Sequence, residues 1–200
     1  MHYMRESATT GRRASQRQQT ARRINSCAQR LAELHGLDGF SMDDLADVAG
    51  VSRRTLFNYF PGKDAAVLGD PLELDRELAD RFVAGGPTGH LVEDMVALIE
   101  PALAGEGFTR EDVARSRRLL AAEPRLLAAA HERFADIGAE VLELVAAREG
   151  ADHDAARASI VIHVLAVLFD SALTAFISDP RRELQELFDD AIRIARSAFA

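Results

Sequence analysis

The chain has 200 residues, 48% of them hydrophobic, and a formal net charge of -8, a composition that indicates an ordinary globular protein with a continuous core. Cys27 is the only cysteine, which excludes an intramolecular disulfide and a thiolate metal cluster and is typical of a reducing compartment. Ala, Leu, Glu and Arg dominate whereas β-branched residues are sparse, so we predict an all-α protein of about nine helices.

The charge is distributed unevenly along the chain. Residues 1–65 carry ten Lys or Arg against seven Asp or Glu, net +3, and the remaining residues carry fourteen against twenty-five, net -11. A basic end on an acidic body favours an anionic partner at the N-terminal end, because the rest of the chain would repel a polyanion. A solvated basic tail without a partner explains the charge equally well.

Two observations bear on location. The first sixteen residues lack the apolar core of a secretory signal. The longest apolar run, residues 160–169, is about half the length that a membrane span requires. We therefore expect a cytoplasmic protein that does not enter a membrane.

The N-terminal residues 1–16 are polar and basic, and we expect them to form a flexible arm because they offer little apolar surface to bury. A first helix is predicted over residues 17–35, where apolar residues recur at helical spacing and Gly36 follows as a stop.

Two short helices are predicted next. Ser41 is an N-cap for a helix that ends at Gly50, and Ser52 caps a second helix that ends before Pro61. Two short helices after a longer one are typical of the helix-turn-helix arrangement, so we expect a three-helix DNA-binding domain over residues 17–63. Longer amphipathic helices are predicted beyond it, near residues 63–69, 72–84, 89–104, 109–122, 124–149, 153–178 and 181–199.

The second short helix has two chemically different sides. One side is apolar and is expected to pack on the preceding helices; it comprises Leu56, Phe57 and Phe60. The other side is polar and comprises Arg54 and Asn58, flanked by Thr55 and Tyr59. Guanidinium, amide and hydroxyl groups read base edges and hold phosphates in a DNA major groove. A helical hairpin with a merely polar exterior is the alternative.

Other groups are expected to position the DNA backbone. The long stem of Arg53 can reach round from the helix start, and the N-terminal N–H groups of helices that begin after Ser41 and Ser52 or near Lys63 can bind phosphate. Arginines at positions 12, 13, 17, 22 and 23 are expected to follow the backbone or enter a minor groove. The predicted DNA contacts are Ser41, Ser52, Arg53, Arg54, Thr55, Asn58, Tyr59 and Lys63.

The segment GFSMDDLADVAGVSRRTLFNYFPGKDAAV, residues 39–67, resembles the DNA-binding signature of TetR-type (TetR/AcrR-like) regulators. The matching groups are Phe40-Ser41, Leu45-Ala46, Ala49-Gly50-Val51-Ser52, Thr55-Leu56-Phe57, Tyr59-Phe60 and Lys63. Two positions depart from the commonest form: Phe57 replaces a tyrosine, and Pro61-Gly62 precedes the lysine. Past residue 70 the likeness is one of length and helix count.

The resemblance implies a homodimer that binds a palindromic operator, usually as a repressor released by a small molecule. It implies that residues 64–200 form a helical regulatory and dimerisation domain, paired with its mate through helices 153–178 and 181–199. Residues 160–169 are apolar nearly all round, as expected for a helix covered by its own core and by a partner. Burial wholly inside a monomer is the alternative.

By analogy a ligand would bind within the helices between residues 89 and 178, and an apolar or amphipathic effector is expected. Candidate ligand contacts are Met95, Phe108, His131, Phe134, His163 and Phe169. The two histidines could orient a polar group of the ligand, or serve as satisfied core residues. Arg117 and Arg118 could hold an anionic ligand or form a solvated helix face. Segment 63–84 is the expected link by which the effector releases DNA.

Two other classes of protein compete with this interpretation. An enzyme is not expected, because the chain contains no HExxH motif, nucleophile elbow or recognisable carboxylate pair. No cofactor or metal is expected either; His153 lies between two aspartates, but a helix cap explains that placement. A helical protein-interaction module without specific DNA binding is the main alternative, and it predicts no salt-sensitive DNA binding.

Overall fold

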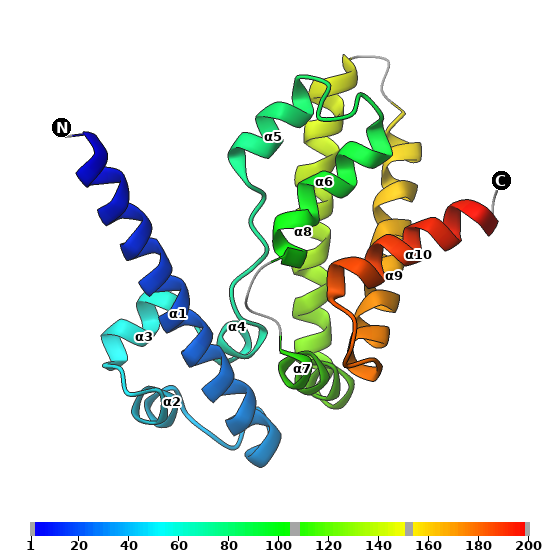
Figure 1. The fold of residues 1–200 in the computed structure, drawn as a ribbon. Helices are drawn as coiled ribbons and strands as arrows, with labels where there is room; N and C mark the ends of the chain where they lie inside the picture. Colours follow the sequence, from blue (N-terminus) through cyan, green and yellow to red (C-terminus); the bar gives the residue numbers. More distant parts are fainter. Residues whose placement is uncertain (1–2, 105–108, 151–153, 199–200) are drawn as a thin grey trace. The chain divides into compact units, whose positions relative to one another are not determined.

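The computed structural model describes residues 3–104, 109–150 and 154–198. Within these ranges the chain forms ten helices and no strand (Figure 1), so the prediction of an all-α protein of about nine helices is confirmed. The helices are α1 (Tyr3–His35), α2 (Met42–Ala49), α3 (Arg53–Tyr59), α4 (Lys63–Leu68), α5 (Arg76–Val83), α6 (Leu91–Ala104), α7 (Arg110–Ala122), α8 (Pro124–Glu149), α9 (Ala155–Ser178) and α10 (Leu184–Ala198).

Helix α1 begins earlier than the sequence pattern predicts. It starts at Tyr3 instead of near residue 17, so the backbone of the expected arm is the first part of the same helix. The physical reason is composition: Arg, Ala, Met, Glu and Gln are good helix formers, and no proline interrupts residues 3–16. That this basic segment is flexible stays a prediction.

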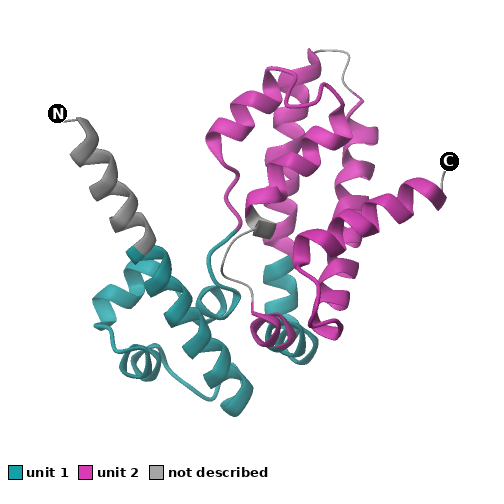
Figure 2. Cartoon of the chain, viewed as in Figure 1, with its two compact units in different colours: residues 1–71, 115–130 teal, residues 72–114, 131–200 magenta. Residues whose placement is uncertain are grey.

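The chain divides into two compact units (Figure 2). The first comprises residues 1–71 and 115–130, and the second comprises residues 72–114 and 131–200. The division therefore passes through α7 and α8 and does not follow the boundary expected after residue 63. The reason is shared packing, because α4 supplies Ala66 and Val67 to the first core while α7 and α8 supply Leu119 and Leu126.

In the first unit, polar contacts join α4 and α7 to α1. The Asn25 side chain donates hydrogen bonds to the carbonyl oxygens of Ala66 and Val67, each at 2.8 Å. Farther along α1, Glu33 accepts from Arg118 in α7 at 2.6 Å, and this hydrogen bond lowers the pKa of the Glu33 carboxyl. Because Arg118 is engaged with Glu33 inside this unit, the structure does not support a role for Arg118 in holding an anionic ligand.

In the second unit the core is built around α9 and α10. The buried residues of α9 include Ile162, Leu165 and Phe176, and those of α10 include Leu187 and Phe188. Both stripes follow helical spacing, so each helix presents one side to this core.

The opposite face of α9 is apolar and exposed. Ile160, Val164 and Val167 are 64%, 44% and 67% exposed, so burial of this run wholly within the monomer is wrong. Helix α9 has 24 residues and contains an 18-residue window with a mean hydropathy of 2.2, so by length and composition it could cross a membrane, contrary to the estimate from the shorter run. A helix with one face in a protein core and a second, exposed apolar face is also expected where a partner protein covers that second face.

The second unit contains a buried ion pair between Asp94 and Arg148. The Asp94 carboxylate is fully buried and accepts from the backbone N–H and hydroxyl of Thr88 at 2.6 and 2.7 Å. The Arg148 guanidinium pairs with the same carboxylate at 2.8 Å, donates to the Phe82 carbonyl and lies over the Phe82 ring. Burial acts to raise the pKa of Asp94, but the hydrogen bonds from Thr88 and Arg148 outweigh it, and the pKa lies below its usual range.

Asp94→Ala is expected to lower the free energy of unfolding by about 3 kcal/mol at neutral pH, because it leaves the Arg148 guanidinium buried without its counter-charge. Urea unfolding measures the change. Glu93→Ala is the matched control: Glu93 forms an exposed pair with Arg196 at 2.9 Å, so its loss is expected to cost less than about 1 kcal/mol. Equal decreases in the free energy of unfolding of the two variants would contradict the assignment of Asp94 and Arg148 as a stabilising buried pair.

The same pair predicts a pH dependence. The Asp94 pKa is lower in the folded chain than in the unfolded chain, where an aspartate titrates near pH 3.9, roughly. The carboxylate therefore stabilises the fold above that pH, and this contribution is lost as the pH falls through the lower folded-state pKa. The difference in unfolding free energy between the native chain and Asp94→Ala should shrink below about pH 4, and a constant difference would count against this explanation.

Candidate functional site

The start of α2 is fixed by a reciprocal cap. The Ser41 hydroxyl accepts from the Asp44 N–H at 3.2 Å, and the Asp44 carboxylate accepts from the Ser41 N–H at 2.8 Å. This capping box occupies two backbone donors, and the hydrogen bonds to Ser41 lower the pKa of Asp44. Ser41 therefore stands where the sequence predicts it, with its side chain committed to the cap.

The turn between α2 and α3 depends on Gly50. Its φ of 63° lies in the left-handed region, and its N–H donates to the Ala46 and Asp47 carbonyls, which ends α2. Two residues later the Ser52 hydroxyl accepts from the Thr55 N–H at 3.0 Å and begins α3. The chain therefore leaves one helix and enters the next within a few residues, as a helix-turn-helix requires.

Helix α3 buries a narrower side than expected. Leu56 and Phe60 lie in the core of the first unit, but Phe57 is 43% exposed, so its predicted burial is wrong. At 100° per residue Phe57 is rotated by about that angle from Leu56, which places it at the rim of the contact. The Arg53 guanidinium covers the Phe57 ring at 5.6 Å from the ring centre.

The polar side of α3 faces outward. Arg54 and Asn58 are exposed and one helical turn apart, so a single contacting surface would meet both. Thr55 and Tyr59 flank them half-buried, and the Thr55 hydroxyl lies 2.7 Å from that of Ser52. The structure thus brings these four predicted DNA contacts together on one short helix.

Arg53 and Lys63 have partners within the chain. Arg53 forms a two-pronged pair with the Asp43 carboxylate in α2, at 2.9 and 2.7 Å, and both side chains are exposed. Exposed pairs contribute little, so Arg53 can exchange this carboxylate for a phosphate at small cost. The Lys63 ammonium donates to the Phe40 carbonyl at 2.9 Å and lies 5.2 Å from the Phe40 ring centre. Lys63 therefore links α4 to the segment before α2 and also supplies a positive charge.

These features define a DNA-binding unit. It is a capped helix-turn-helix, and its second helix exposes groups that suit base edges and phosphates. Residues 24–68 match the family described as bacterial regulatory proteins, tetR family, and residues 94–200, more than half of the chain, match the family described as MftR C-terminal domain. The chain belongs to the TetR family of transcriptional regulators, and the expectation of a regulator in place of an enzyme is confirmed by these matches.

Individual relatives agree over shorter stretches. A candidate mycofactocin biosynthesis transcriptional regulator, MftR, of Mycobacterium tuberculosis (strain H37Rv) is 40% identical over 34% of this chain and 32% of its own length. The HTH-type transcriptional regulator EthR of Mycolicibacterium smegmatis is 49% identical over 24% of each chain. This chain thus aligns with about a third or less of these relatives. A crystal structure of a candidate TetR-family regulator of Mesorhizobium loti aligns with 86% of this chain and 91% of its own, at 19% identity and a TM-score of 0.35.

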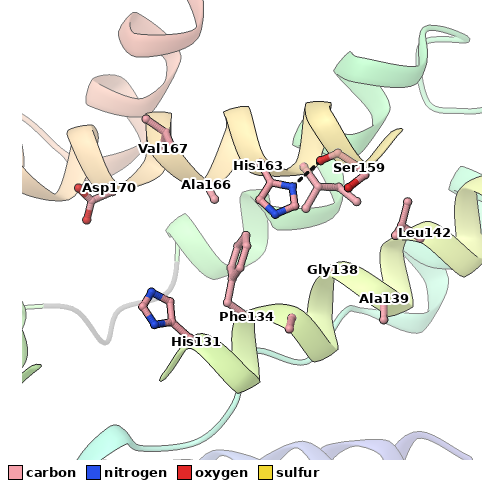
Figure 3. Close-up of a pocket in the computed structure, with 12 residues that line it drawn as sticks. His131, Phe134, Gly138, Ala139, Leu142, Ser159, His163, Ala166, Val167 and Asp170 are labelled. Atoms are coloured by element: carbon pink, nitrogen blue, oxygen red, sulfur yellow. Dashed lines mark hydrogen bonds between the residues drawn. The ribbon is translucent and has the colours of Figure 1, made fainter. Parts of the chain in front are cut away.

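A second candidate site is a groove between α8 and α9 in the second unit (Figure 3). It has a volume of about 730 Å³. The α8 side is formed by His131, Phe134, Ala135, Gly138, Ala139 and Leu142, and the α9 side by Ser159, Ile162, His163, Ala166, Val167 and Asp170. The described residues contain no group of three or more His, Cys, Asp or Glu placed to hold a metal ion.

The groove contains three of the six predicted ligand residues. His131, Phe134 and His163 line it, and both histidines are exposed, so their interpretation as buried core residues is wrong. Met95 is buried in the core of the second unit, and the Phe169 ring packs edge-to-face on Phe188 at 6.0 Å. Phe108 lies outside the described residues, as does His153. The small lining residues of α8 were missed, although their spacing of three and four places them on one helix face.

His163 is held in one tautomer. Its Nδ1 lies 2.7 Å from the Ser159 carbonyl oxygen, and since a carbonyl only accepts, Nδ1 must carry the proton. In the neutral ring Nε2 is then a hydrogen-bond acceptor. The Phe134 ring packs edge-to-face on this imidazole at 6.2 Å, rising from α8 beside it in Figure 3.

Gly138 is in the interior of α8 without a backbone reason for glycine. It is not among the described glycines with positive φ, and a Cβ built there would lie 3.7 Å from the Ile162 side chain, an ordinary contact. A glycine inside a helix costs about 0.5–1 kcal/mol relative to alanine. Its effect here is to leave the groove open.

Gly138→Ala is expected to raise the free energy of unfolding by about 0.5–1 kcal/mol, because the new methyl group fits and the unfolded chain loses freedom. Chemical denaturation measures it. Gly50→Ala is the matched control and should destabilise by about 1 kcal/mol or more, because its φ is 63°. Destabilisation by Gly138→Ala would mean that the glycine is needed for helix packing.

Proposed function

We propose that the protein is a homodimeric, cytoplasmic repressor that binds a palindromic DNA operator through α3 and is released by a small-molecule effector. The exposed pair of Arg54 and Asn58, opposite the buried side of α3, is the observation that carries the proposal. An arginine can bind a guanine edge with two hydrogen bonds, and an asparagine can bind an adenine edge in the same way.

The remaining predicted contacts have a positioning role in this proposal. Arg53 exchanges its Asp43 carboxylate for a phosphate, and Thr55, Tyr59 and Lys63 hold the adjacent backbone. The N-terminal N–H groups of α2 and α3, next to Ser41 and Ser52, add donors of positive polarity. Such contacts set the register of α3 on the duplex without reading its sequence.

The exposed apolar stripe of α9 supports the dimer. Ile160, Val164 and Val167 form an unpaired surface on this helix, and Ile194 on α10 is also exposed. Paired across a two-fold axis, such stripes would bury one another, and the axis would space two α3 helices for successive major grooves, about one DNA turn apart.

The release step rests on continuous helices. Helices α7 and α8 contribute residues to both compact units, and the Glu33 contacts with Arg115 and Arg118 tie α7 to α1 within the first unit. An effector that favours a different placement of α7 or α8 would thereby disfavour the DNA-bound arrangement, and only such differential affinity can release DNA. The segment 63–84 then contributes through α4, which packs in the same unit.

Selection from a pool of random duplexes, followed by sequencing, tests sequence reading. The native chain is expected to enrich a palindrome, and Arg54→Ala to weaken binding to it by about 1–3 kcal/mol and to relax one base position in each half-site. Arg76→Ala is the matched control, since Arg76 is an exposed arginine at the start of α5 in the second unit.

The salt dependence of DNA binding distinguishes specific binding, nonspecific binding and no binding. Binding to the enriched site should fall steeply between about 50 and 200 mM salt, because phosphate contacts release counterions. Salt-sensitive binding without an enriched site would reduce the basic end to a nonspecific arm. No binding at any salt concentration would favour a helical protein-interaction module.

Ile160→Glu is expected to convert the dimer to a monomer in sedimentation velocity, because an isologous interface would bury the new carboxylate twice. Leu34→Glu is the control: Leu34 is 74% exposed on α1 in the first unit, so the dimer should persist. A dimer that survives Ile160→Glu would place the interface elsewhere.

A further inference from the structure

We propose that Asp43 acts as an internal mimic of a DNA phosphate. It competes with the DNA backbone for Arg53 and thereby weakens binding to every duplex, whatever the sequence. This inference rests on the proposed binding of DNA through α3 and adds a residue of α2 that sets the strength and the salt dependence of that binding. The observation that carries it is the pairing of Arg53 with Asp43 beside the exposed ring of Phe57.

The two arginines at the start of α3 have different surroundings. Arg53 pairs with the Asp43 carboxylate, whereas Arg54 forms no ion pair with any residue that the structure describes. Both side chains are exposed and both follow Ser52, so the start of α3 presents two positive charges, of which one is balanced inside the chain. A phosphate therefore meets Arg54 directly but has to displace a carboxylate to reach Arg53.

Asp43 does not share the capping role of its neighbour Asp44. The Asp44 carboxylate accepts from the N–H and the hydroxyl of Ser41, at 2.8 and 2.7 Å, which commits it to the start of α2. The Asp43 oxygens accept from Arg53 alone among the described residues, at 2.9 and 2.7 Å. One of the two acids in this turn thus serves as a counter-charge for α3.

The pair has the geometry of a contact between arginine and an anion that can be exchanged. Both Asp43 oxygens accept from Nη1 of Arg53, and the guanidinium lies over the Phe57 ring, 5.6 Å from the ring centre. A phosphate offers a guanidinium the same arrangement of two oxygens on one anionic group. The side chains of Arg53 and Asp43 are 64% and 59% exposed, so the exchange requires no rearrangement of the helices.

Displacement leaves the Asp43 carboxylate close to the DNA. The aspartate side chain is short, so after the exchange its charge stays near the phosphate that Arg53 has bound. This carboxylate repels the backbone and attracts a cation, which offsets the cation that Arg53 releases from the DNA. Asp43 thus lowers both the affinity and its salt dependence, and because phosphates carry no sequence information, the effect is the same for every duplex.

Fluorescence anisotropy with the full-length chain tests the proposal on two labelled duplexes, the selected operator and a duplex of unselected sequence. Asp43→Asn should tighten binding to both by the same factor, about fivefold for each bound subunit at about 50 mM salt. The gain should fall below about twofold at about 200 mM, because the slope of log K against log salt becomes steeper by about 0.9 for each bound subunit.

Asp47→Asn is the matched control, since Asp47 is an exposed acid one turn farther along α2 and has no pair with Arg53. Its removal should change the affinity less than about twofold at either salt concentration. Equal tightening by Asp43→Asn and Asp47→Asn would mean that the net charge of α2 is responsible and would overturn the proposal.

A double-mutant cycle with Arg53→Ala tests the pairing itself. Part of the phosphate contact of Arg53 is offset in the native chain by the loss of its Asp43 pair, so Arg53→Ala should weaken binding at least about twofold more in the Asp43→Asn chain than in the native chain. Equal effects of Arg53→Ala in the two backgrounds would overturn the competition. Weaker binding by Asp43→Asn would overturn it too, because Asp43 would then position Arg53 for DNA.

The native chain separates failure of this inference from failure of the proposed function. If the native chain binds DNA but Asp43→Asn binds no more tightly, the competition is wrong and the DNA-binding function stands. If the native chain binds neither duplex at any salt concentration, the DNA-binding function fails and the competition fails with it. Thermal unfolding of each variant establishes that the fold is intact.

Discussion

The left-handed turn at Gly50 is the constraint on which the DNA-binding unit depends. It ends α2 with two carbonyls satisfied, and Ser52 caps α3 two residues later. Because the two helices join without a flexible loop, burying Leu45 of α2 and Leu56 of α3 against α1 also determines which side of α3 faces solvent. The exposure of Arg54 and Asn58 therefore follows from packing on the other side of the same helix.

Local chemistry explains which parts of this unit the sequence predicts. Caps, glycine stops and prolines act within a few residues, and α2, α3, α7 and α8 begin within a residue of their predicted positions. Side-chain burial is harder, since spacing alone does not say how wide the contact is. Leu34, Val48 and Phe57 fit apolar patterns but are exposed, because the core they border is already closed by Leu31, Ala49 and Phe60.

Contacts between distant segments were beyond sequence reasoning. Nothing near Glu33 indicates that Arg115 and Arg118 reach it, or that Leu119 and Leu126 complete the core of a unit whose other residues end at position 71. A domain boundary placed after residue 63 would therefore separate the core of the first unit from residues of α4, α7 and α8 that complete it.

The groove between α8 and α9 shows the opposite case, because Gly138 lies inside α8 although glycine is a poor helix former. Glycine lowers the stability of a helix interior such as that of α8. The exposed Phe134 and His163 beside Gly138 also leave apolar surface in contact with water. The stable alternative, a bulkier side chain that closes the groove, would remove both costs. In the proposed function, a small-molecule effector that fills the groove would offset both costs, beside a His163 ring whose Nδ1 donates to the Ser159 carbonyl.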